Sequence, residues 1–222
     1  MNIAIDGPAG AGKSTVARKV AEQLGYVYID TGAMYRAVTL SAQRAGVSVK
    51  QTAKLAELVR SLEIELAPGE QGQSVFVNGE NVTALIRSRE VTLQVSYFAA
   101  NETVREVLGH LQRKLAERKG VVMDGRDIGS HVLPNAELKI FLTASVKERA
   151  LRRYREIVDS QTISLSQLEA EIAQRDRLDE QRDISPLICA SDAVVLDSTA
   201  MTIDEVIAAI VKLSRTKLAE AK

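Results

Sequence analysis

Eight consecutive residues near the start of the sequence have the types and spacing of a phosphate-binding loop. They match the pattern G-x-x-x-x-G-K-[ST] and read Gly7-Pro8-Ala9-Gly10-Ala11-Gly12-Lys13-Ser14, with Thr15 following. Glycines let the backbone turn tightly with its N–H groups directed inward at phosphate oxygens. The lysine of such a loop reaches the outer phosphates, and the serine hydroxyl is offered to Mg²⁺. We therefore expect residues 7–15 to bind a nucleoside triphosphate, with Ser14 as a ligand of Mg²⁺.

The residues around this loop predict the setting that the motif requires. Ile3-Ala4-Ile5 is typical of a short buried strand, which ends at Asp6. After the loop, apolar residues recur at helical spacing, at Val16, Ala17, Val20, Ala21 and Leu24. The N-terminus of a helix adds partial positive charge to the loop. This context disfavours the alternative for the motif alone, a glycine-rich turn that binds nothing.

Composition limits the class of protein. The chain has 222 residues, of which 45% are hydrophobic and 26% charged, and this fits one α/β domain with insertions or one domain with a small satellite. The net charge is zero, so no global field favours nucleic acid or a membrane surface. No apolar run is long enough to span a membrane, and the chain enters a strand directly, unlike a signal peptide. We expect a cytoplasmic monomer with neither nucleic acid nor a membrane as a partner.

The single cysteine, Cys189, fits a reducing compartment and excludes an internal disulfide. It lies between apolar residues, in Leu187-Ile188-Cys189-Ala190. This favours a small core residue over a nucleophile.

Five short strands rich in valine and isoleucine alternate with helical patterns along the chain. The strands are expected near residues 3–6, 26–30, 120–124, 138–142 and 193–197, and the helices at 33–45, 53–62, 84–99, 101–117, 145–158, 164–178 and from 202. Thr31-Gly32 is expected to close the second strand, and Gly46 to end the helix that follows. The alternation predicts a parallel sheet covered on both faces.

One segment does not fit a parallel sheet. Residues 63–82 contain Pro68-Gly69, Gly72 and Asn78-Gly79, and Val75-Phe76-Val77 before Asn78-Gly79 is the signature of a hairpin with a primed turn. We interpret this segment, with its flanking helices, as a small inserted lobe.

Ligands of such sheets bind beyond the carboxyl ends of the strands. The phosphate loop follows the first strand, Asp30 through Arg36 follow the second, and Arg126-Asp127 follow the third. Arginine is a two-pronged donor to phosphate, and aspartate accepts from an exocyclic amino group such as that of cytosine. Asp124, at the end of the third strand, is expected either to orient magnesium-bound water or to make a structural hydrogen bond to the loop.

A further cluster of charge runs from Arg175 to Arg182, with Arg149, Arg152, Arg153 and Arg155 upstream. One interpretation is a solvated, ion-paired helix surface. The other is an arginine lid that closes over phosphates, which is favoured because arginine nearly replaces lysine here and a phosphate loop lies in the same chain.

With these motifs, the chain resembles the bacterial cytidylate kinases, a branch of the nucleoside monophosphate kinases, essentially from end to end. The resemblance rests on residues 5–15, on Asp30-Thr31-Gly32-Ala33-Met34-Tyr35-Arg36, on Asp124-Gly125-Arg126-Asp127-Ile128-Gly129 and on Arg175-Asp176 through Asp179 and Arg182. It implies an α/β P-loop kinase fold: a five-stranded parallel sheet flanked by helices, an inserted monophosphate-binding lobe and a helical arginine-rich lid. The expected division is a core at 1–45, 101–145 and 186–222, an insert at about 46–100 and a lid at about 146–185.

The same resemblance implies transfer of the terminal phosphate of ATP to CMP or dCMP. Cytosine would be recognised by Ser96, Arg105 and Asp127, the CMP phosphate would be held by Thr31, Arg36, Arg126 and Arg182, and the sugar would contact Arg175 and Asp179. Charge on the transferring group would be neutralised by Mg²⁺, Lys13 and lid arginines such as Arg149 and Arg153, with Arg126 orienting the acceptor. Some relatives have glycine at the position of Ser14, which weakens its assignment as a metal ligand.

Two other functions stay open at this stage. One is phosphoryl transfer on the same fold to UMP, AMP or a non-nucleotide acceptor. The other is a nucleotide-dependent switch, against which the sequence lacks an Asn-Lys-x-Asp guanine motif after the later strands.

Overall fold

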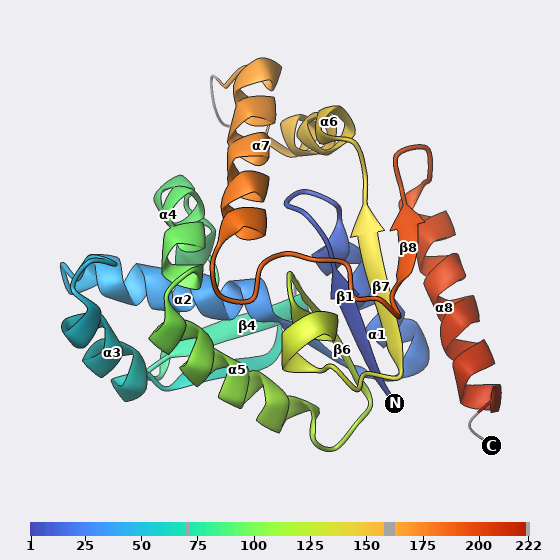
Figure 1. Ribbon diagram of the computed structural model, residues 1–222, viewed down its shortest axis with the longest axis horizontal. Helices are drawn as coiled ribbons and strands as arrows, with labels where there is room; N and C mark the ends of the chain where they lie inside the picture. The colour runs from blue at the N-terminus through green and yellow to red at the C-terminus, as the bar shows by residue number, and fades with distance from the viewer. Residues whose placement is uncertain (70–71, 158–162, 221–222) are drawn as a thin grey trace. The chain divides into compact units, whose positions relative to one another are not determined.

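The structure is a computed structural model that describes residues 1–69, 72–157 and 163–220 (Figure 1). The chain divides into two compact units. Unit 1 comprises Met1–Tyr28 and Lys119–Lys222, and unit 2 comprises Ile29–Arg118. The finer division into core, insert and lid stays a prediction.

Unit 1 contains most of a parallel sheet whose central strand precedes the phosphate loop. The five strands lie in the order β2-β6-β1-β7-β8 and have the bounds β1 Asn2–Asp6, β2 Val27–Asp30, β6 Val121–Gly125, β7 Leu138–Thr143 and β8 Val194–Asp197. The register aligns Ile5 of β1 with Asp124 of β6 and with Ile140 of β7, so the carboxyl ends of these strands meet at one edge. The five strands expected from the sequence and their parallel pairing are thus confirmed.

Helices α1 (Lys13–Leu24) and α8 (Ile203–Glu220) pack on this sheet. Their buried apolar residues form one core with β1, β6 and β7, which includes Val16, Val20, Ile207 and Ile210. A short π-helical turn, η2 (Ile128–Val132), contacts β1 and β6. The sheet is therefore flanked by helices, as expected.

Two further helices of unit 1, α6 (Val146–Ile157) and α7 (Leu165–Gln181), follow β7 and pack against each other (Figure 1). They share a small core of Ala150, Ile163, Leu168 and Ile172. The hydroxyl of Ser164 accepts from the N–H of Gln167 and caps α7. α7 continues three residues beyond the expected end at Leu178, and the expected end of α6 at Val158 lies outside the described residues.

Unit 2 surrounds a buried helix, α2 (Thr31–Arg44). One side of α2 packs with α3 (Thr52–Ser61), α4 (Arg89–Ala99) and α5 (Glu102–Ala116). Its other side, at Ala33 and Ala37, packs with Val75, Val77 and Ile86. Val75 and Val77 belong to the central strand of an antiparallel sheet of β3 (Ile64–Gly69), β4 (Gly72–Val77) and β5 (Glu80–Asn81). Ile86 belongs to a 3₁₀ turn, η1 (Leu85–Arg87).

The expected primed turn is present at Asn78-Gly79. Both residues have positive φ, 49° and 81°, which suits a two-residue hairpin loop between β4 and β5. The sheet extends beyond that hairpin, because β3 pairs with the whole length of β4.

Three local expectations were wrong. Thr31-Gly32 does not close a strand but opens α2, because the Asp30 carboxylate accepts from the N–H of Ala33 and caps the helix. The segment 84–99 is not one helix, since Ser88 ends η1 and caps α4. Cys189 is exposed rather than buried in the core. No helix among the described residues is long and apolar enough to cross a membrane.

Candidate active site

The phosphate loop connects β1 to α1 and requires glycine at its first residue. Gly7 has φ of 148°, and a Cβ atom there would collide with the carbonyl oxygen of Leu142 on β7. Gly12, the residue before α1, has φ of 84°, in the left-handed region. The sequence motif therefore folds as a tight loop packed directly against the sheet.

Lys13 is the first residue of α1 and its side chain bends back over the loop. Its Nζ donates to the carbonyl oxygen of Pro8 at 2.7 Å, and the residue is buried. Burial, and then the positive charge of Arg126, hold the pKa of Lys13 well below its usual value, while Asp124 opposes this shift.

Two arginines add positive charge at the same place. Burial, followed by repulsion from Arg126, lowers the pKa of Arg175 to about 10. The Nε of Arg175 is buried and has no hydrogen-bond acceptor among the described residues. Arg126 thus lies close enough to Lys13 and Arg175 to disfavour their charges. Burial would lower the pKa of Arg126 itself, but Asp179 outweighs burial and the net pKa of Arg126 is raised. This local excess of positive charge suits the binding of an anion.

Two carboxylates hold arginines at this site. Arg126 donates from Nε to Asp179 at 2.8 Å, and Arg182 donates from Nη2 to Asp127 at 3.3 Å. Burial raises the pKa of Asp179, but Arg126 and Arg175 outweigh burial, so the net pKa is lowered. Asp179 is therefore ionised at neutral pH and balances part of the cationic charge.

Two oxygen-bearing side chains meet beside the phosphate loop, those of Ser14 at the start of α1 and Asp124 on β6. The Ser14 hydroxyl donates to Asp124 Oδ2 at 2.9 Å, and the Tyr28 hydroxyl donates to Asp124 Oδ1 at 2.9 Å. A hydroxyl and a carboxylate are hard oxygen ligands of the kind that Mg²⁺ binds together with substrate phosphates. These residues fit such an ion. The bond that Asp124 accepts from Ser14, the last residue of the loop motif, is also the kind of structural hydrogen bond that was the alternative role for this carboxylate.

The arginines of α6 differ in their surroundings. Arg149 is buried and donates to Ala9 O and to Asp176, whereas Arg153 is half exposed and pairs with Glu156 at 2.8 Å. Arg152 bonds Glu148 and Ser198. The charged cluster is therefore a solvated surface at Arg153 and a buried network at Arg149.

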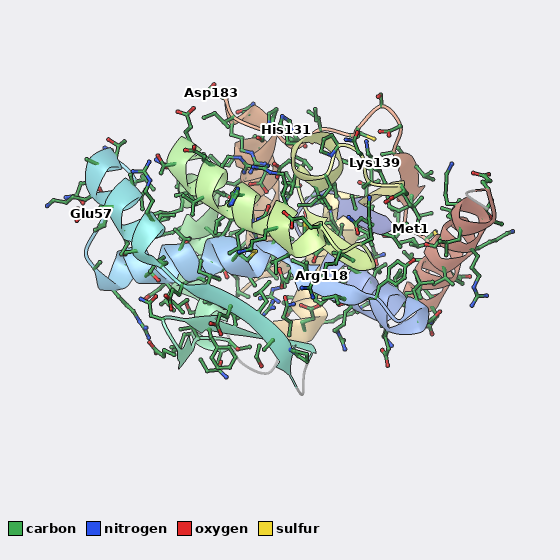
Figure 2. The ribbon with its side chains drawn as sticks, turned by 90° about the horizontal axis from the view of Figure 1, so that it is seen from below. Met1, Glu57, Arg118, His131, Lys139 and Asp183 are labelled. Atoms are coloured by element: carbon green, nitrogen blue, oxygen red, sulfur yellow. The ribbon has the colours of Figure 1, made fainter. Side chains whose placement is uncertain are left out.

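Asp6, at the end of β1, fixes the start of η2. Its two carboxylate oxygens accept from the N–H groups of Ile128 at 2.8 Å and Gly129 at 2.7 Å. Burial raises the pKa of Asp6 to about 6 against the effect of these two donors. The aliphatic part of the Lys139 side chain, on β7, lies next to Gly129. Figure 2 labels Lys139 and also His131 of η2. Asp6 therefore positions the segment that directly follows Arg126 and Asp127.

Unit 2 carries the other expected substrate residues on three packed helices. Thr31 and Arg36 lie on α2, Ser96 on α4 and Arg105 on α5. Arg36 donates to Thr92 Oγ1 at 2.7 Å and to Ile86 O at 3.3 Å. Arg105 is buried, donates to Ala99 O at 3.1 Å, and its guanidinium lies 5.5 Å from the centre of the Tyr35 ring.

Within unit 1 the structure brings together Lys13, Ser14, Asp124, Arg126, Arg175 and Asp179, which the sequence separates widely. It leaves Arg153 at the surface. Sequence reasoning gave no role to Tyr28, Asp6 or Asp176. The sequence pattern gave little indication of their roles, because each is a single polar residue beside a recognised motif or at a strand end.

A parallel sheet with a G-x-x-x-x-G-K-[ST] loop between its central strand and the next helix defines a P-loop protein of the α/β class. Within that class, the profile of the family described as cytidylate kinase matches residues 3–216. The chain belongs to the cytidylate kinase family.

Curated relatives agree over nearly the whole length. A cytidylate kinase of Exiguobacterium sibiricum is 55% identical over 219 residues, which covers 98% of both chains. A cytidylate kinase of Bacillus subtilis is 55% identical over 207 residues, which covers 93% of this chain and 92% of the relative. A crystal structure of an uncharacterised protein from Eubacterium ventriosum superposes with a TM-score of 0.53 at 11% identity, covering 97% of this chain and 98% of the other, and so supports the fold alone.

Proposed function

We propose that the protein transfers the terminal phosphate of ATP to CMP or dCMP, giving ADP and CDP or dCDP. Family membership supports the reaction. The structural observation that carries the proposal is the cluster of three cations at the phosphate loop, in which Lys13 is buried, Arg126 and Arg175 are partly buried, and Arg126 lowers the pKa of the other two. Such a group gains most when phosphate oxygens neutralise it.

The reaction needs alignment and charge neutralisation more than a strong base, because the accepting oxygen of a nucleoside monophosphate is already anionic. Lys13 would neutralise charge on the transferring group, and Arg126 would orient the accepting phosphate. Residues 7–15 would hold the phosphates of ATP through loop N–H groups and the N-terminus of α1. Burial of Lys13 and partial burial of Arg126 strengthen their interaction with phosphate, because water screens it less.

Magnesium is the proposed divalent cation, with Ser14 as a direct ligand and Asp124 acting through water. When bound, Mg²⁺ would neutralise charge on the phosphates of ATP. Tyr28 holds the second oxygen of Asp124 and so fixes the orientation of that carboxylate.

For the acceptor, the resemblance to the family supplies the proposed roles. The CMP phosphate would be held by Thr31, Arg36, Arg126 and Arg182, and the sugar by Arg175 and Asp179. Asp127 would accept from the exocyclic amino group of cytosine, and Ser96 and Arg105 would contribute further polar contacts. Neutralisation by Arg149 and Arg153 stays a prediction from the sequence.

Asp127 gives the proposal its selectivity. Uracil has a carbonyl oxygen where cytosine has an amino group, and that oxygen would face the carboxylate of Asp127. A site built around polar partners rejects an analogue that leaves them unpaired.

The first experiment measures ADP release from ATP and Mg²⁺ with CMP, dCMP, UMP, AMP or no acceptor. Fast turnover with CMP and dCMP alone is the expected result. Turnover with UMP or AMP would contradict the roles of Ser96, Arg105 and Asp127. Slow hydrolysis without any acceptor would point to a nucleotide-dependent switch instead.

A second experiment isolates cytosine recognition. Asp127→Ala should weaken CMP binding by about 10- to 100-fold, because a hydrogen bond to a charged group is lost, and should leave ATP binding nearly unchanged. Calorimetric titration with each nucleotide separates the two effects. Asp204→Ala, at an exposed carboxylate in the first turn of α8, is the matched control. Equal losses for ATP and CMP would reject the assignment.

A further inference from the structure

Ala9, the third residue of the phosphate loop, has both of its backbone polar groups bound by side chains of α6 and α7. Its N–H donates to Asp176 Oδ1 at 3.0 Å, and its carbonyl oxygen accepts from Arg149 Nη1 at 2.7 Å. The N–H of Ala9 is therefore engaged by a carboxylate of the protein itself.

The two side chains also bind each other. Arg149 Nη1 donates to Asp176 Oδ2 at 2.7 Å, and Arg149 Nε donates to Ala144 O, which lies between β7 and α6, at 2.8 Å. Arg149, Asp176 and Ala9 are all buried, with exposed fractions of 4%, 7% and 3%. A buried ion pair with its hydrogen bonds made is rigid, and removing one partner leaves the other charge uncompensated.

The next loop residue packs against the same two helices. A Cβ atom at Gly10 would lie 3.3 Å from Arg149 Cβ and 3.7 Å from Ile172 Cδ1. The contact between the loop and the helices is thus made by packing as well as by hydrogen bonds.

We infer that Asp176 and Arg149 are positioning residues that hold the phosphate loop in its nucleotide-binding conformation. This inference rests on the proposed role of residues 7–15 in binding ATP. The pair would act on ATP through Ala9 and not by contact with the transferring phosphate, which is an alternative to the catalytic role that the sequence predicts for Arg149. Because α6 and α7 supply the two side chains, movement of either helix away from the loop must break these bonds.

The test compares substitutions at both positions by their effect on each substrate. Asp176→Ala and Arg149→Ala should each raise the Kd and KM for ATP by about tenfold or more, since small displacements of a site have large effects, and should change the KM for CMP much less. The double variant should be little worse than either single variant, because both remove the same set of bonds.

Conservative variants separate positioning from charge. Asp176→Asn keeps an oxygen that can accept from Ala9 and should recover part of the ATP affinity lost in Asp176→Ala. Arg149→Lys keeps the charge but lacks the guanidinium that bridges Ala9, Asp176 and Ala144, so it should not recover. Full recovery in Arg149→Lys would indicate a role of charge alone and would overturn the inference.

Arg152→Ala is the matched control, because Arg152 lies on the same helix, pairs with Glu148 and bonds Ser198. It should lower thermal stability without changing the Kd for ATP. Loss of stability with unchanged ATP affinity in Asp176→Ala would refute positioning of the loop. If the unaltered protein fails to phosphorylate CMP while its ATP affinity still depends on Asp176, the proposed function fails and the present inference stands.

Discussion

Asp6 is buried, and its carboxylate accepts hydrogen bonds from two backbone N–H groups. Of these two influences, burial has the stronger effect on the pKa of Asp6. The carboxyl is 5% exposed and its pKa is raised from 3.8 to about 6. A carboxyl whose pKa is higher in the folded than in the unfolded protein binds its proton more tightly when folded. Its contribution to stability is therefore fully present below pH 3.8 and is lost as pH rises through about 6.

This direction predicts an unusual pH dependence at one residue. The difference between 3.8 and about 6 corresponds to roughly 3 kcal/mol of unfolding free energy. Asp6→Asn removes the titration, so the unaltered protein should gain stability relative to the variant as pH falls from about 7.5 to about 4.5. Urea unfolding of both proteins across this range measures the difference. Parallel pH profiles would show that Asp6 does not titrate in this way.

Two glycines of the phosphate loop should respond differently to an added methyl group. At Gly12 nothing lies within 4 Å of the position of Cβ, so Gly12→Ala adds backbone strain of about 1–2 kcal/mol. Gly7→Ala adds strain and also forces the loop away from Leu142 on β7, so it should destabilise more and weaken ATP binding. Urea unfolding and titration with ATP measure both effects. A Gly7→Ala protein as stable as Gly12→Ala would contradict the packing at Leu142.

At the scale of elements, side-chain caps mark the start of several helices of this chain. Asp30, Ser88, Asn101 and Ser164 each accept a backbone N–H from the first turn of a helix. The start of α8 is a reciprocal pair, in which Glu205 accepts from the N–H and hydroxyl of Thr202 and donates its own N–H back to that hydroxyl. Such a box satisfies donors that the helix leaves unpaired.

The cap on α8 can be tested without touching the candidate site. Thr202→Ala should lower the unfolding free energy by about 1 kcal/mol, because the box is lost. Thr216→Ala, on the exposed side of the same helix, removes only a hydroxyl that bonds Lys212 O and should be close to neutral. Denaturant unfolding of the two variants compares them directly. Equal effects would mean that the box adds nothing beyond ordinary side-chain loss.

At the scale of the whole molecule, each of the two units has its own buried core, and each carries residues expected to contact substrate. The loop cations belong to unit 1, and Thr31, Arg36, Ser96 and Arg105 belong to unit 2. Binding to the folded chain alone stabilises it by mass action, in proportion to the logarithm of ligand concentration.

Selective stabilisation by substrate is therefore expected. CMP at about 100 times its Kd should add about 2.7 kcal/mol to the unfolding free energy, or roughly 5–10 °C in Tm. UMP at the same concentration should give a much smaller shift. Scanning fluorimetry with each nucleotide measures this, and ADP serves as a positive control for the phosphate loop. Equal shifts with CMP and UMP would argue against cytosine selection.

Features that depend on neighbouring residues could be predicted from the sequence. These include the phosphate loop, the five strands, the primed turn at Asn78-Gly79 and the caps at Ser164 and Thr202, and the family resemblance is confirmed. Local patterns were less reliable where a cap or packing overrode them, as at Thr31-Gly32, Ser88 and Cys189. The roles of the site residues, a monomeric state and a cytoplasmic location stay predictions.

By itself the sequence determined the class of fold and the loop that defines it, because a strand, a glycine turn and a helix are encoded in contiguous residues. Only the tertiary structure decided which distant side chains meet. Asp6 binds Ile128 across 122 positions, Tyr28 binds Asp124 across 96, and Arg149 binds Asp176 across 27. The strand order β2-β6-β1-β7-β8 was likewise absent from any local pattern. Such pairings depend on how the elements pack, and no spacing along the chain specifies them.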